Sequence, residues 1–110
     1  MKVINFTNGS ISESQFDEVR INDFNKRRIS ACLHSLRNEH DTNRIDFLAN
    51  SLAQFASEIS RGDPNKAKVV ITGFSPADVQ LKIAKAMLLH GFDTYRTNIT
   101  GEDVTWIDPR

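Results

Sequence analysis

The sequence has one cysteine, no long hydrophobic run and no excess of either charge. Cys32 alone cannot form an intramolecular disulfide, so a packed core has to hold the fold. Apolar stretches reach only a few residues, and the segment after Met1 turns polar before it can form the core of a signal peptide. We therefore expect a cytoplasmic protein that has no membrane partner.

The charges are balanced along the chain as well as in total. Lysine and arginine together number 14, as do aspartate and glutamate, and residues 1–55 and 56–110 each hold seven of either sign. The protein therefore has no global field that attracts nucleic acid or a membrane surface. A net charge near zero favours association with other protein molecules instead.

Residue types that carry catalysis are few and do not fall together. Helical spacing places Cys32 on an apolar face and His34 on a polar one, so the two cannot act as a nucleophile and its base. His34, His40, Asp41 and Asp46 are not spaced three or four residues apart on one helix face, as the ligands of a metal site would be. We expect no cofactor and no metal, and we expect Cys32 to be a buried core residue. An enzyme is the less favoured class of protein.

Length and composition fit one domain that spans residues 1–110. The chain has 110 residues, and two separate cores would leave each half too small to persist without disulfides or metal. Its 39% hydrophobic and 25% charged residues are ordinary for a globular protein. The chain has no internal repeat and no low-complexity tract.

The first half of the sequence predicts a short strand and a helical hairpin. Residues 3–6 have strand composition and end in turn residues, and a capping box at Ser12 and Gln15 predicts a short helix from about Glu13. Whether residues 13–39 form one helix or two elements stays open. Helical spacing predicts one helix over residues 24–38 and a second that Asn43 caps and Gly62 ends. The core stripe of the second helix is regular: Ile45, Leu48, Leu52, Phe55 and Ile59.

The second half predicts a strand, a helix and a terminal β-hairpin. Residues 68–72 are β-branched and apolar, as in a central strand that is covered on both faces. Pro76 suits the first position of a helix that runs to His90, and Gly91 suits its left-handed end. Alternating polarity over residues 93–99 and 104–107 predicts two more strands. The strand, helix and strand from 69 to 99 form one right-handed βαβ unit with parallel strands.

These elements predict an α/β fold, with α+β as the alternative. We expect a small mixed sheet of three to four strands, on which the helical hairpin and one crossover helix pack. The strand order stays open.

Three surfaces are candidate binding sites. Phe24 and Phe47 fall outside the apolar stripes of their helices, and Trp106 lies near Glu102 and Asp103 on the terminal hairpin. Aromatic anchors beside charges are typical of protein interfaces, although acidic residues on an edge strand also prevent unwanted strand pairing. We therefore expect a non-catalytic interaction module, an adaptor, inhibitor or regulatory protein that binds another protein or a second copy of itself.

Two alternatives use other residues. Nucleic acid is the first alternative partner, bound through a basic helix face whose charges neutralise phosphates: Lys26, Arg27, Arg28, His34, Arg37 and Arg44. A solvated helix face has the same composition. The second alternative is an anion or nucleotide at the strand-to-helix turn Gly73, Phe74 and Ser75, where open α/β sheets bind ligands. Helix capping explains the same residues.

Overall fold

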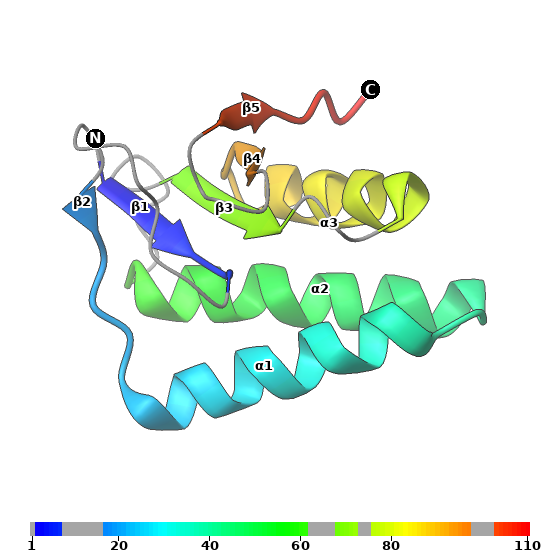
Figure 1. The fold of residues 1–110 in the computed structure, drawn as a ribbon, viewed down its shortest axis with the longest axis horizontal. Helices are drawn as coiled ribbons and strands as arrows, with labels where there is room; N and C mark the ends of the chain where they lie inside the picture. The colour runs from blue at the N-terminus through cyan, green and yellow to red at the C-terminus, as the bar shows by residue number, and fades with distance from the viewer. Residues whose placement is uncertain (1, 8–16, 62–67, 73–75, 98–102) are drawn as a thin grey trace.

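Within the residues that the structure describes, three helices and a mixed sheet make up the fold (Figure 1). The computed structural model describes residues 2–7, 17–61, 68–72, 76–97 and 103–110. The helices are α1 (Asp23–Asn38), α2 (Thr42–Ile59) and α3 (Ala77–Leu89). The strands are β1 (Lys2–Asn5), β2 (Asp17–Glu18), β3 (Lys68–Thr72), β4 (Thr94–Thr97) and β5 (Val104–Trp106). The predicted α/β class is confirmed.

The sheet has the strand order β2-β1-β3-β4-β5, which the sequence left open. Strands β2, β1, β3 and β4 run parallel, and β5 runs antiparallel to β4, so the sheet is mixed as predicted. Four strands have three residues or more, and the two-residue β2 extends one edge. The segment predicted to be the central strand, β3, lies in the middle of the sheet.

The predicted βαβ unit and terminal hairpin are both present. β3 and β4 pair in parallel, with Val69 opposite Thr94, and α3 connects them. β4 and β5 pair antiparallel, with Tyr95 opposite Trp106. At the end of α3, Gly91 takes a φ of 83°, and the Phe92 amide donates to the Met87 carbonyl oxygen at 3.0 Å. The left-handed glycine thus ends the helix and turns Phe92 into the core.

Residues 13–39 form separate elements. The helix expected from Glu13 falls partly on residues 13–16, which lie outside the described residues, and at Asp17 the chain is in strand β2. A new helix, α1, begins after Asn22, whose side-chain oxygen accepts a hydrogen bond from the Asn25 amide at 2.8 Å. Asn22 therefore caps α1 and ends the extended segment before it.

Two helix starts differ from the prediction by one or two residues. Asp41, not Asn43, caps α2: the Asp41 carboxylate accepts a hydrogen bond from the Asn43 amide at 2.9 Å, so Asn43 lies in the first turn of the helix. Pro76 is the residue before α3 and has extended backbone angles, so the helix begins at Ala77. Gly62 and Ser75, which were expected to end α2 and to cap α3, lie outside the described residues.

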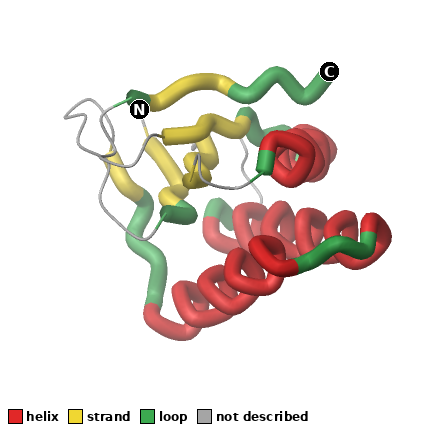
Figure 2. The backbone as a smooth tube through the Cα atoms, turned by 45° about the vertical axis from the view of Figure 1, so that its right-hand side comes forward, coloured by secondary structure: helices red, strands yellow, loops and turns green. Residues whose placement is uncertain are grey.

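The core lies between the sheet and the helices. Figures 1 and 2 show α1 and α2 side by side along one side of the sheet, with α3 next to α2. Ile4, Val69 and Ile71 of the sheet belong to one cluster of buried side chains with residues of all three helices. Val70 is also fully buried, although its side chain alternates to the other face of β3. The centre of the sheet is therefore covered on both faces.

A matched pair of leucine substitutions tests where the core lies. Leu52 of α2 has no exposed surface, whereas Leu89 at the end of α3 is 83% exposed. We expect Leu52→Ala to lower the free energy of unfolding by about 2–5 kcal/mol, because it leaves a cavity in the core. Leu89→Ala removes the same atoms at a position where solvent surrounds them. It should change the free energy of unfolding by less than about 0.5 kcal/mol. Urea unfolding of the two variants measures both values, and similar losses would contradict this placement of α2.

Candidate functional site

The helical hairpin of α1 and α2 has an outer face that the core does not use. The helices pack through their apolar stripes, and at their contact the buried Cys32 thiol donates a hydrogen bond to the Leu48 carbonyl oxygen at 3.3 Å. The residues of the outer face come from both helices, and of these Arg28 and Phe55 are half-buried while the others are exposed: Phe24, Arg28, Arg44, Phe47, Phe55 and Glu58. We call this set the hairpin outer face.

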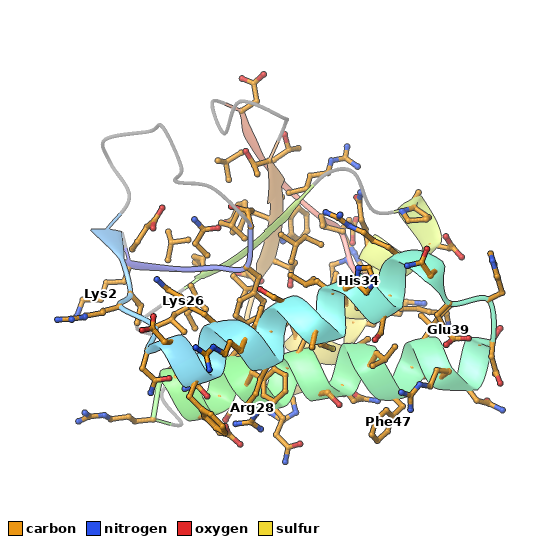
Figure 3. The ribbon with its side chains drawn as sticks, turned by 60° about the horizontal axis from the view of Figure 1, so that its bottom comes forward. Lys2, Lys26, Arg28, His34, Glu39 and Phe47 are labelled. Atoms are coloured by element: carbon orange, nitrogen blue, oxygen red, sulfur yellow. The ribbon has the colours of Figure 1, made fainter. Side chains whose placement is uncertain are left out.

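Aromatic and guanidinium groups are stacked on the hairpin outer face. Phe24 is 69% exposed and Phe47 is 59% exposed. The Arg28 guanidinium lies 5.5 Å from the centre of the Phe24 ring and 4.3 Å from that of Phe55. The Arg44 guanidinium lies 5.4 Å from the centre of the Phe47 ring. Figure 3 shows Arg28 and Phe47 on the same side of the hairpin.

One ion pair joins the two helices across this face. The Arg28 guanidinium donates to a Glu58 carboxylate oxygen at 3.4 Å, and both side chains remain partly exposed. An exposed pair of this length contributes less than about 1 kcal/mol to stability. Its effect is mainly to hold Arg28 over the rings of Phe24 and Phe55. Arg44 forms no ion pair within the part of the chain that the structure describes.

The six residues of the predicted basic face do not form one surface. Lys26, Arg27, His34, Arg37 and Arg44 are exposed, and Arg28 is half-buried. Figure 3 places Lys26 and His34 on one side of α1 and Arg28 on the other. The guanidinium groups of Arg28 and Arg44 lie over phenylalanine rings of the hairpin outer face. The structure thus divides the set between two sides of the hairpin.

The predicted partner-binding residues also lie in two places. Phe24 and Phe47 share the hairpin outer face, whereas Trp106 belongs to β5, an edge strand of the sheet that Figure 1 shows well away from α1 and α2. Trp106 is 46% exposed and Asp103 is exposed. Glu102 lies outside the described residues. One partner surface therefore cannot include both the hairpin outer face and Trp106.

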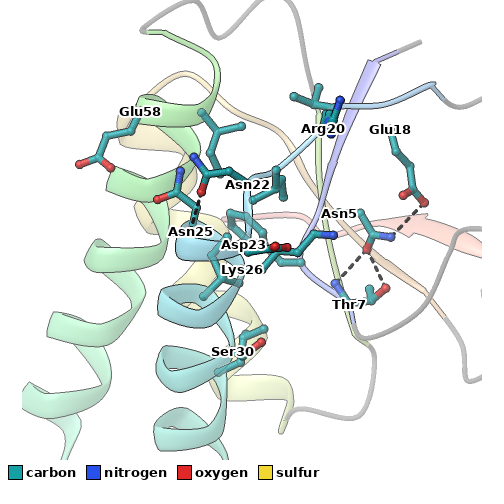
Figure 4. A pocket seen from close by; sticks show the side chains of 16 residues that line it. Asn5, Thr7, Glu18, Arg20, Asn22, Asp23, Asn25, Lys26, Ser30 and Glu58 are labelled. Atoms are coloured by element: carbon teal, nitrogen blue, oxygen red, sulfur yellow. Dashed lines mark hydrogen bonds between the residues drawn. The ribbon is translucent and has the colours of Figure 1, made fainter.

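An open pocket of about 1130 Å³ lies where the carboxyl ends of β1 and β2 meet the first turns of α1 (Figure 4). Figure 4 shows Asn5, Thr7 and Glu18 on one side of it and Asn22, Asn25 and Lys26 on the other. The side-chain oxygen Oδ1 of Asn5 accepts from the Thr7 amide at 2.8 Å and from the Thr7 hydroxyl at 2.6 Å. The Asn5 amide group donates to Glu18 at 3.0 Å. The Asn5 side chain thus holds Thr7 and Glu18 in place on the strand side of the pocket.

Sequence reasoning did not identify this pocket. Its lining joins the ends of β1, β2 and α2 and the start of α1, which the pairing of β2 with β1 and the packing of the two helices bring together. The polar residue Asn5 near the end of the predicted strand and Thr7 directly after it were the one available signal. The anion site predicted at Gly73, Phe74 and Ser75 lies outside the described residues.

Among the described residues, no group of three His, Cys, Asp or Glu side chains is placed to hold a metal ion. No helix in the described segments combines the length and apolar character that crossing a bilayer requires. Comparison with known proteins finds no match to the chain among family models, curated proteins or solved structures.

Cys32 gives a test of the hairpin packing. Burial raises the pKa of the Cys32 thiol to about 11, and the positive charge of Arg44 opposes this rise in part. At pH 8 the native chain therefore has about one thiolate in a thousand molecules. We expect iodoacetamide to label the native chain about 100-fold or more slowly than the urea-unfolded chain, because only the thiolate reacts. Mass spectrometry measures the labelling, and equal rates in both states would contradict the buried placement.

Proposed function

We propose that this chain is a non-catalytic interaction module that acts by binding protein, and that the hairpin outer face is its docking surface. The surface suits an α-helical partner that presents apolar side chains together with charges of both signs. Such a partner covers the exposed rings and pairs with the arginine beside each of them.

The observation that supports this proposal most is the placement of Phe24 and Phe47. These side chains are both more than half exposed on one face of the hairpin, although the described part of the chain buries most of its other large apolar residues. Each ring has an arginine stacked on it. Aromatic residues and arginine are the residue types that contribute most to binding energy in protein interfaces. Their occurrence together favours a docking surface over an ordinary solvated helix face.

Nucleic-acid binding has less support. Lys26 and Arg28 point to different sides of α1, so the basic residues do not line one track along which a phosphate backbone can run. The hairpin outer face itself has two arginines and one glutamate, and the whole chain has no net charge. A small positive excess of this kind favours a partner with mixed charges.

Affinity capture with matched variants tests the proposal. The tagged chain, the variant Phe24→Ser/Phe47→Ser and the control Leu89→Ser are used to capture proteins from a lysate of the source organism. We expect the double variant to retain at least about tenfold less of its bound protein than the wild type, because the two central anchors are lost. The control removes an equally exposed apolar side chain elsewhere and should retain it. Capture that is equal for all three chains would contradict the proposal, provided that circular dichroism shows all three to be folded.

A further inference from the structure

We propose that the helical partner of the hairpin outer face is a second copy of this chain, with α2 packed antiparallel against α2 of the other copy. The inference rests on the proposed function, since it names the partner of the same surface. It follows from the symmetric order of side chains along the side of α2 that carries Phe47.

Five residues on one side of α2 form a stripe with symmetric spacing, in which Arg44, Phe47 and Glu58 are exposed and Ser51 and Phe55 are half-buried. They are Arg44, Phe47, Ser51, Phe55 and Glu58, and successive members are separated by three, four, four and three residues. This spacing keeps all five on one side of a helix. The order of side-chain types is also symmetric about Ser51, with a phenylalanine four residues away on each side and a charge seven residues away on each side. The two charges have opposite signs.

An antiparallel second copy of this stripe is complementary to the first. With a twofold axis at Ser51, reversing the direction of the helix brings Phe47 of one copy opposite Phe55 of the other. It also brings Arg44 opposite Glu58. Both pairs occur twice because of the symmetry, as in any interface between identical surfaces related by a twofold axis. A parallel arrangement would place arginine against arginine and glutamate against glutamate, so charge complementarity selects the antiparallel one.

The centre of the stripe allows the helices to approach each other. Ser51 is small and half-buried, and its hydroxyl donates to the Phe47 carbonyl oxygen at 3.0 Å. Covering Ser51 with a second helix therefore leaves no hydroxyl without a partner. On the neighbouring helix, α1, the small residue Ala31 is exposed and Ser35 is half-buried. The exposed amide side chains Asn50 and Gln54 lie on α2 to one side of Ser51.

The ends of the stripe supply the contacts. At one end, Phe55 lies beside Phe24 and under Arg28, with a guanidinium-to-ring distance of 4.3 Å. This cluster is a ready site for the exposed Phe47 ring of the other copy. At the other end, Arg44 has no ion-pair partner within the described residues, and a second copy offers it Glu58. The pairs Arg28 with Glu58 and Arg44 with Glu58 then form one charge network across the interface.

Charge reversal at the two ends tests both the dimer and its direction. In Arg44→Glu both cross-copy charge pairs become glutamate against glutamate. In Glu58→Arg both charge pairs become arginine against arginine. In an equimolar mixture of the two variants, a mixed dimer regains an opposite-charge pair at both ends. The variants also suit the helix dipole, because a negative charge enters the first turn of α2 and a positive charge enters its last turns. Thermal melting checks that each variant is folded.

Sedimentation velocity over a concentration series gives the measurement. We expect the wild type to dimerise, each single variant to dimerise about tenfold or more weakly, and the mixture to dimerise as strongly as the wild type. Phe47→Ser should also weaken the dimer. The control Lys85→Glu reverses an exposed charge on α3 and should dimerise like the wild type.

Three outcomes would overturn the inference. A wild-type chain that stays monomeric at every concentration rules out a second copy as the partner, while the capture experiment still decides whether the hairpin outer face binds another protein. Single variants that dimerise as well as the wild type rule out the pairing of Arg44 with Glu58. Two weak variants whose mixture is also weak rule out the antiparallel arrangement.

Discussion

The burial of β3 on both of its faces is the constraint on which the rest of this structure depends. Val69, Val70 and Ile71 are consecutive and have no exposed surface, so side chains on both faces of the strand are out of water. The strand pairs in parallel with β1 on one side and with β4 on the other. Parallel neighbours need crossover connections, and these connections are the helices that cover the sheet.

The arrangement of the crossovers leaves α2 with two different surfaces. α2 lies between α1 and α3, and its core stripe is buried against the sheet and its neighbours. On the side toward α3, Asp46 accepts a hydrogen bond from the Lys82 ammonium at 2.7 Å. The remaining side carries Phe47 and belongs to the hairpin outer face. A helix in the middle of a layer thus packs its buried side chains against the sheet and still has a second ordered stripe that a partner can contact.

The aromatic rings of the hairpin outer face contact arginine side chains of the same chain, and these contacts do not bury the rings of Phe24 and Phe47. Arg28 and Arg44 cover the rings of Phe24 and Phe47 only in part, and these two rings remain more than half exposed, whereas Phe55 is half-buried. Such contacts reduce the hydrophobic area that meets water and so favour solubility of the free chain. They also hold the rings in place, which lowers the entropic cost of covering them with a partner.

The sequence by itself determined the elements whose signals are local. The β-branched run of β3, the helical spacing of α1 and α2, and the left-handed Gly91 each depend on residues a few positions apart, so they were predictable. Helix starts were less certain, since Asp41 and Asn43 both have side chains that can cap a helix. Only the tertiary structure decided the strand order, the pocket beside Asn5 and the separation of Arg28 from the other cations. These features depend on packing between elements distant in sequence, and periodicity within one element contains no information about its neighbours.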